Sequence, residues 1–235
     1  MKYHIFPLGE NAVTLDFGNM IDEDINKKVI VLFDWWKENK LNGIKDIIPA
    51  YSSLTLIYDV EEISNQSGDS STFEFLKQKM EDSFKKVNWR KSSTSRQIEI
   101  PVCYYSSLAP DLQLLADEKK LQMEEVIQLH TSRTYRVYII GFLPGFAYLG
   151  KVDERISMPR KTNPRPLVYQ GSVGIAGEQT GVYPLDSPGG WNIIGQTPLR
   201  LFDPQKEDLV LLQAGDEVKF LSITLKEFHQ IKSQQ

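Results

Sequence analysis

Glycine and proline gather in one stretch of the chain, and this feature restricts the possible folds more than any other. Residues 141–198 hold 10 of the 15 glycines and 7 of the 12 prolines. Proline removes a backbone donor and glycine weakens the interiors of helices and strands, so long regular elements are excluded there. Short β-type runs lie among and around these turns, at 135–140, 167–169, 172–176, 192–195, 199–202, 209–212 and 217–223. Many short strands separated by Gly/Pro turns predict a β-barrel or a β-sandwich.

The first 95 residues follow a different pattern, in which strands and helices alternate. Apolar and polar residues alternate over 13–17, and apolar residues recur at helical spacing over 21–36 and 73–87. The remaining elements are short apolar runs, at 44–48, 54–58 and 97–102. The resulting order, β-α-β-β-α-β, predicts the split βαβ arrangement of ferredoxin-like domains, with another α/β sandwich topology as the alternative.

A polar, serine-rich segment at residues 90–96 predicts a linker between two domains. We therefore expect an N-terminal α/β domain over residues 1–95 and a β-barrel or β-sandwich domain over residues 96–235. Residues 110–131 are expected to form two short amphipathic helices, and residues 65–71 a loop. The fold class predicted for the whole chain is α+β.

Composition narrows the class of function. The chain has 235 residues, a formal net charge of −4 and a single cysteine, Cys103. Mild acidity gives no electrostatic footprint for nucleic acid or an anionic membrane. One cysteine allows no internal disulfide and fits a reducing compartment. No run of 18 apolar residues and no signal-peptide pattern occurs, so we expect a cytoplasmic protein.

Three common catalytic patterns fail. Residues 145–152 have the Walker A spacing as far as the lysine, but Val152 stands where Ser or Thr would hold magnesium. Residues 171–174 are one residue short of a serine-hydrolase elbow, and the sequence cannot bring Ser172, His130 and Asp186 together. The three histidines are far apart and show no metal-ligand spacing, so no metal site is expected.

The segment from residue 158 to residue 198 is the best candidate for a ligand site. Arg160 and Arg165 bracket a proline-stiffened loop, and guanidinium forks on a rigid loop suit carboxylate or phosphate capture. Neutral donors and acceptors follow at Gln179, Thr180, Tyr183 and Asn192. These groups predict a pocket for an anionic ligand. The alternative is that glycine and proline only shape barrel corners and that the arginines are solvated.

Apolar side chains in the same loops suggest a protein interface. They are Phe142, Leu143, Phe146 and Trp191. Exposed groups of this kind would dock a partner chain, whereas buried ones would belong to the barrel core.

Four long strings resemble the signature of one family. They are YIIGFLPGFAYLG at 138–150, PRKTNPRP at 159–166, GSVGIAGEQTGVYP at 171–184 and SPGGWNIIGQTP at 187–198. The chain resembles the B-subunit family of bacterial 5-oxoprolinase, also called the KipI or allophanate-hydrolase subunit 1 family. The resemblance extends from LGENAVTLDFG near the start to AGDEVKF at 214–220.

This resemblance implies a small N-terminal α/β domain followed by a cyclophilin-like β-barrel. It implies a protein that acts with a C subunit (KipA-like) and an A subunit to open 5-oxoproline to glutamate, with ATP and Mg²⁺ used by the complex. It also implies a second possibility, since some members bind a sporulation histidine kinase and block its autophosphorylation.

On these motif positions we assign hypothetical roles. Gln179 and Tyr183 are candidate catalytic residues that orient the reacting amide. Candidate substrate-binding residues are Arg160, Arg165, Thr180 and Asn192. Candidate interface residues are Phe142, Phe146 and Trp191.

Overall fold

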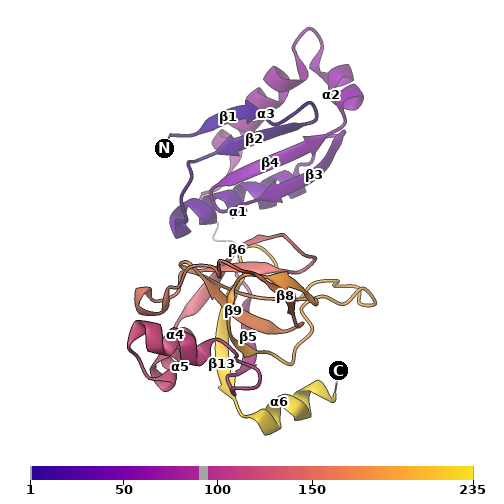
Figure 1. Ribbon diagram of the computed structural model, residues 1–235. Coiled ribbons are helices and arrows are strands. Elements are labelled where there is room, and N and C mark those ends of the chain that lie inside the picture. Colours follow the sequence, from indigo (N-terminus) through magenta and orange to yellow (C-terminus); the bar gives the residue numbers. More distant parts are fainter. Residues whose placement is uncertain (1, 90–94, 235) are drawn as a thin grey trace. The chain divides into compact units, whose positions relative to one another are not determined.

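The computed structural model describes residues 2–89 and 95–234 (Figure 1). The chain divides into two compact units, Met1–Ser95 and Arg96–Gln235. Most of the predicted linker, residues 90–96, lies outside the described residues. Among the described residues, no helix has both the length and the apolar character that a bilayer crossing needs.

The first unit is an α/β unit, a four-stranded antiparallel sheet with helices packed on it, but its element order, β-β-α-β-β-α-α, differs from the predicted β-α-β-β-α-β. The sheet order is β1-β2-β4-β3. Its strands are β1 (His4–Pro7), β2 (Ala12–Asp16), β3 (Ile44–Pro49) and β4 (Ser53–Tyr58). Its helices are α1 (Glu23–Glu38), α2 (Val60–Ser67) and α3 (Thr72–Lys86). The two longer helices confirm the helical spacing of the sequence.

Alternation and capping explain these elements. Leu54, Leu56 and Tyr58 are buried while their neighbours in β4 are half-buried, so one face of the sheet carries the core. Asp22 caps the start of helix α1, where its carboxylate accepts a hydrogen bond from the backbone N–H of Ile25.

Two predictions for this unit are wrong. Residues 97–102 do not close its sheet, because they form β5 (Gln97–Cys103) of the second unit. The edge beside β2 is taken by β1, a short and mostly exposed strand that ends at a proline and gives little periodic signal. The expected loop at 65–71 begins inside α2, a helix whose N-cap Asp59 accepts from the backbone of Glu62.

The second unit is a closed seven-stranded barrel in the order β10-β7-β6-β13-β5-β12-β9. Its further strands are β6 (Thr134–Ile140), β7 (Ala147–Gly150), β9 (Ser172–Ala176), β10 (Gln179–Val182), β12 (Asn192–Gln196) and β13 (Glu217–Ile223). β5 and β13 run parallel, and the other neighbouring strands run antiparallel. The barrel prediction is therefore confirmed.

Smaller elements surround the barrel. Strands β8 (Arg165–Val168) and β11 (Ser187–Gly189) form a separate two-stranded ribbon. The helices are α4 (Leu112–Lys119), α5 (Met123–Thr131), the 3₁₀ turn η1 (Glu154–Ile156) and α6 (Leu225–Lys232). The expected strands at 199–202 and 209–212 contribute only the isolated bridge between Phe202 and Val210.

Alternation decides which side chains fill the barrel. Val173 and Ile175 belong to the buried core cluster of the barrel, as do Leu149 and Val182. The residues between them point the other way, because successive side chains of a strand face opposite sides. On β9 and β10 the outward positions include glycines, and this shapes the surface described next.

Candidate functional site

Two glycines make a flat floor on the outside of β9 and β10. A Cβ added to Gly181 would lie 2.9 Å from the carbonyl oxygen of Ala147 and 3.1 Å from the ring of Trp191. A Cβ added to Gly174 would lie 3.0 Å from the Cβ of Trp191. Trp191 therefore packs against backbone, in space that any larger residue would fill.

Aromatic rings gather on this floor, and we call Phe146, Tyr148, Tyr183 and Trp191 the outer cluster. The ring centroid of Phe146 lies 4.8 Å from Tyr148, 5.2 Å from Tyr183 and 5.4 Å from Trp191. The edge-on and tilted geometries are the favourable ones for aromatic pairs. The cluster is a small hydrophobic core of its own, separate from the barrel interior.

Tyr183 is held in one orientation. Burial raises the pKa of its phenol, and the backbone N–H of Trp191, which donates to the phenolic oxygen, opposes that rise only in part. A Cβ on Gly189 would lie 2.8 Å from the ring carbon that carries the hydroxyl, so only glycine fits there. The phenol is therefore neutral near pH 7 and fixed against β11.

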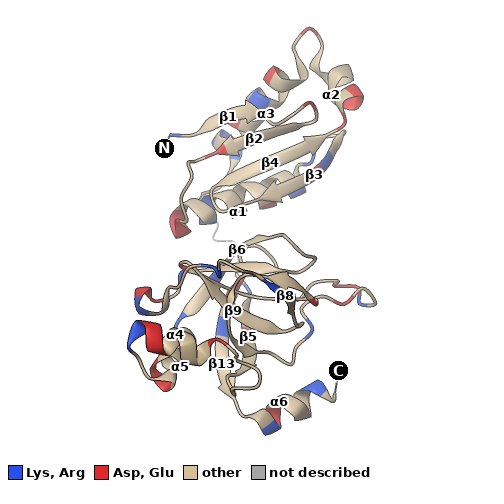
Figure 2. Ribbon diagram, in the orientation of Figure 1, with Lys and Arg blue, Asp and Glu red and all other residues tan. Residues whose placement is uncertain are grey.

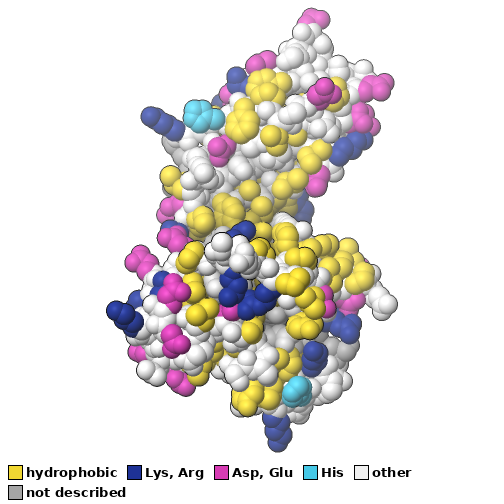
Figure 3. Space-filling view, viewed as in Figure 1, with side chains coloured by type: hydrophobic (Ala, Val, Ile, Leu, Met, Phe, Trp, Pro, Cys, Tyr) yellow, Lys and Arg dark blue, Asp and Glu magenta, His cyan; other side chains and the backbone are white. Residues whose placement is uncertain are grey.

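Arg160 places an exposed positive charge over the outer cluster. Its guanidinium carbon lies 5.8 Å from the centre of the Trp191 ring, within cation–π distance. Its charge also reaches Tyr148, where burial raises the phenol pKa and Arg160 opposes the rise. Lys and Arg side chains gather on one face of this unit with hydrophobic side chains beside them (Figure 3), and one Lys or Arg position lies on β8 (Figure 2).

A buried carboxylate organises the basic loop, residues 159–166. Asp111 is 2% exposed and accepts hydrogen bonds from the two terminal guanidinium nitrogens of Arg165, at 2.7 and 2.6 Å. It also pairs with Lys161 at 2.7 Å and accepts the backbone N–H of Ile193 at 2.7 Å. Burial by itself would raise the pKa of Asp111, but Arg165, Lys161 and the Ile193 amide together hold it below the ordinary value.

This pairing changes the role expected for Arg165. The Arg165 guanidinium already bonds the carboxylate of Asp111 in the same chain, so its role is to hold the basic loop in place. Arg160 is the arginine that remains exposed. Asp111 and Lys161 were missed by the sequence analysis, because no local pattern shows a carboxylate pairing with an arginine 54 positions away.

Asn192 fixes the same loop from the barrel side. Its amide nitrogen donates to the carbonyl oxygens of Pro159, at 2.8 Å, and Ile175, at 3.2 Å. Its amide oxygen is buried without a hydrogen-bond partner among the described residues. Asn192 therefore holds the residue that precedes Arg160.

Thr180 lies apart from this surface, whereas Gln179 shares the outward side of β10 with Gly181. Thr180 points into the barrel, where its hydroxyl donates to the carbonyl of Gly174, at 3.0 Å, and bonds His130 at 2.9 Å. Gln179 begins β10, where it pairs with Gly150 on one side and Ala176 on the other. The structure thus brings Arg160, Arg165, Asn192 and Tyr183 to one region but places Thr180 in the core.

The three expected interface residues also differ from one another. Phe146 and Trp191 are 1% and 4% exposed. In the isolated chain, neither residue therefore presents a ring to a partner, contrary to the expectation from the sequence. Phe142 is 64% exposed and has a φ of 73°, a conformation that a residue with a side chain adopts at a cost. Of the three, Phe142 alone therefore offers an exposed apolar ring.

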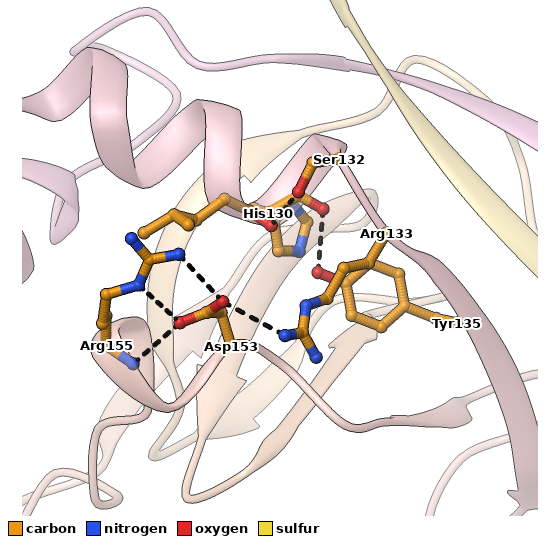
Figure 4. A network of polar contacts seen from close by, with 7 residues as sticks. His130, Ser132, Arg133, Tyr135, Asp153 and Arg155 are labelled. Atoms are coloured by element: carbon orange, nitrogen blue, oxygen red, sulfur yellow. Dashed lines mark hydrogen bonds and ion pairs between the residues drawn. The ribbon is translucent and has the colours of Figure 1, made fainter.

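A separate cavity of about 370 Å³ lies beside η1. Figure 4 shows part of its wall, where Arg133 and Arg155 both bond the carboxylate of Asp153. Its lining residues include three acids and three bases, so its charge is balanced: Arg133, Lys151, Asp153, Glu154, Arg155 and Glu178, with Val152. Within the described ranges, no three His, Cys, Asp or Glu side chains gather as metal ligands do.

Comparison with known proteins defines the class. The family model described as carboxyltransferase domain, subdomain C and D, matches residues 3–212. The chain belongs to this family. More particularly, it is 44% identical to the 5-oxoprolinase B subunit of Bacillus subtilis over 236 residues, which cover 100% of this chain and 98% of that protein. It is also 51% identical over 127 residues to the 5-oxoprolinase B subunit of Escherichia coli O157:H7, covering 54% of this chain and 58% of that protein. These relatives confirm the resemblance found in the sequence.

Solved structures agree. TTHA0988 is 36% identical with a TM-score of 0.78, over 90% of this chain and 40% of that chain. A conserved uncharacterized protein of Pyrococcus horikoshii is 42% identical with a TM-score of 0.56, over 96% of this chain and 100% of that chain. The urea carboxylase of Kluyveromyces lactis, at 17% identity and a TM-score of 0.76, covers 99% of this chain and 23% of that chain and shows the shared fold alone.

Proposed function

We propose that this chain is the B subunit of an ATP-dependent 5-oxoprolinase and that it helps to bind the substrate carboxylate. The observation that carries the proposal is the exposed guanidinium of Arg160, which is held over the buried ring of Trp191. A cation on an apolar platform attracts a small carboxylate and removes water from one side of it. The full-length identity to a 5-oxoprolinase B subunit supports the choice of substrate.

The proposed reaction opens the five-membered lactam of 5-oxoproline. ATP phosphorylates the amide oxygen, water adds to the activated carbon, and glutamate, ADP and phosphate leave. Arg160 would hold the substrate carboxylate, and Tyr183, neutral and fixed by the Trp191 amide, would keep the platform in place. Arg165 and Lys161, bonded to Asp111, would keep the loop in shape.

ATP and Mg²⁺ are assigned to the complex. Magnesium prefers carboxylate, carbonyl and water oxygens, and in the part of the chain that the structure describes no three His, Cys, Asp or Glu side chains are placed to hold a metal ion. The donor set near Arg160 is cationic and fits an anion better than it fits Mg²⁺. We assign binding and orientation to this chain, while the C and A subunits would supply the remaining groups.

Phe142 is the residue that we assign to the partner contact. It is 64% exposed, lies at the turn between β6 and β7, and packs edge-on against Phe146 at 5.6 Å. Through Phe146 it connects directly to the outer cluster. A partner that covers Phe142 would therefore lie beside Arg160 and could complete the site.

Reconstitution tests this proposal. The chain is mixed with its candidate C and A subunits, and glutamate release and ADP formation are measured with and without 5-oxoproline. We expect activity only when this chain is present. Full activity without it would contradict the proposal. If this chain added no 5-oxoprolinase activity but lowered the autophosphorylation of a histidine kinase, the kinase-inhibitor alternative would replace the proposal.

A further inference from the structure

The turn between α1 and β3 contains the dipeptide Asn42-Gly43, which no step of the proposed reaction uses (Figure 1). It is the one Asn-Gly pair in the sequence, and the Asn42 residue is exposed. Asparagine is among the residues that are chemically labile in proteins. Its side-chain amide is attacked most readily when glycine follows, because glycine has no Cβ to crowd the ring that forms.

The fold requires glycine at position 43. Its φ is 87°, in the left-handed region that residues with a side chain rarely adopt. A Cβ at this position would lie 3.0 Å from the Cβ of Glu62 and 3.1 Å from the Cδ1 of Ile63, both on α2. Any larger residue would therefore strain the turn and push against α2. Packing thus keeps a labile dipeptide in an exposed turn.

A hydrogen bond acts on the peptide group that joins the two residues. The side-chain amide of Gln66 donates to the backbone carbonyl oxygen of Asn42 at 3.0 Å. This bond polarises the peptide group, so the Gly43 N–H of the same group becomes more acidic. Among the described residues, no acceptor holds the proton of that N–H. The structure therefore favours loss of this proton, which makes the nitrogen a nucleophile.

We propose that Asn42 is a site of spontaneous deamidation in the folded chain, with water as the co-reactant and Gln66 promoting the reaction. The Gly43 nitrogen gives its proton to solvent and bonds to Cγ of Asn42, and the Cγ–Nδ2 bond breaks as ammonia leaves with a proton from solvent. Water then opens the five-membered succinimide ring at either carbonyl. The product at position 42 is aspartate or isoaspartate. This reaction lies in the first unit and does not rest on the proposed 5-oxoprolinase function.

Both products would change the first unit. Each adds a negative charge next to the acidic start of α2, where Asp59 and Glu62 already share the ammonium of Lys45, each at 3.4 Å. Isoaspartate also inserts a methylene group into the backbone beside Gly43, whose carbonyl accepts the backbone N–H of Asp59 at 2.8 Å. Deamidation should therefore loosen the contact between β3 and α2.

The test follows the purified full chain during incubation near neutral pH, with peptide mapping by mass spectrometry that separates aspartate from isoaspartate. We expect both products at Asn42 before any product at Asn39, an exposed asparagine that precedes a lysine. Gln66→Met keeps the length of the side chain and removes the donor, so it should slow the reaction about fivefold, the effect of one hydrogen bond on a rate. The matched control is Gln78→Met, at an exposed position of α3 that bonds Asp82.

Three results would overturn the proposal. An intact amide at Asn42 after Asn39 has reacted would show that the fold protects the dipeptide. Products that form only in urea-unfolded protein would place the reaction outside the folded chain. Equal rates in Gln66→Met and Gln78→Met would remove the role of Gln66. The structural consequence has its own measurement: Asn42→Asp reproduces one product and should speed hydrogen exchange of the β3 amides, and unchanged exchange would contradict it.

Discussion

His130 allows the sharpest prediction about the barrel, because its surroundings fix both its tautomer and its charge. The Thr180 hydroxyl donates to the carbonyl of Gly174, so it must accept from the Nε2–H of His130. The Nδ1 atom then accepts from the hydroxyl of Tyr104, at 2.8 Å. The ring also stacks on Phe220 at 4.6 Å between centroids. His130 is thus a neutral, completely buried link between α5 and β10.

Burial lowers the pKa of His130 from 6.5 to about 3. The unfolded chain therefore binds a proton below pH 6.5 that the folded barrel does not bind until about pH 3. Stability from this residue is fully present above pH 6.5 and is lost as the pH falls toward 3. The loss is about 2 kcal/mol between pH 7 and pH 5, and about 5 kcal/mol over the whole window.

Native-state hydrogen exchange measures this loss in the right place. The free energy of opening is determined for slowly exchanging amides of β9 and β10 at pH 5, 6 and 7, with amides of the first unit as internal reference. His130→Gln should flatten the pH dependence in the barrel and leave the first unit unchanged. The same pH slope in His130→Gln and the original chain would refute the reasoning, as would an NMR titration of His130 near pH 6.5.

Other predictions concern the loop, the glycine floor and the exposed ring. Asp111→Asn should lower the free energy of unfolding by about 2–4 kcal/mol, less than for a fully buried pair because Lys161 is partly exposed. Asp117→Asn, at an exposed position of α4, should leave it nearly unchanged, and chemical denaturation measures both. Gly189→Ala should lower the free energy of unfolding by about 1–3 kcal/mol, because the new Cβ would overlap the buried phenol of Tyr183. Gly190→Ala, whose Cβ would meet nothing closer than 3.6 Å, should lower the melting temperature far less, and equal melting temperatures for the two variants would contradict the packing. Phe142→Gly should raise the free energy of unfolding by about 1 kcal/mol, because glycine adopts a positive φ without strain. The same change should weaken partner binding measured by calorimetry, and unchanged binding would show that Phe142 is not in the interface.

Much of the fold could be predicted because its signals are local. The helical spacing over 21–36 and 73–87 and the Gly/Pro-punctuated strands follow from short-range sequence patterns. The assignment of 97–102 could not, because β5 pairs with a strand more than 100 residues later and its own sequence fits either sheet. Strand β1 was not predicted, because an exposed edge strand shows little alternation of apolar and polar residues.

The site was predicted in part. Arg160 and Tyr183 stand beside Trp191, which the sequence analysis made a candidate interface residue and which the structure buries against Gly174 and Gly181. Thr180 looked like a ligand donor because it is polar and adjacent to glycine, yet strand alternation turns it inward to His130. Asp111 gave no signal, since its partners lie on distant segments and only the closed barrel brings them together.

The central claim is that the exposed guanidinium of Arg160, held over Trp191, binds the carboxylate of 5-oxoproline for the complex. The most direct measurement is 5-oxoproline-dependent ATP hydrolysis by the reconstituted complex with Arg160→Gln. The matched control is Arg133→Gln, because Arg133 bonds Asp153 beside η1 and is not part of the outer cluster. The account predicts a loss of kcat/KM of about 100-fold or more for Arg160→Gln and little change for the control. Equal kcat/KM for Arg160→Gln and the original chain, in an assembled complex, would contradict it.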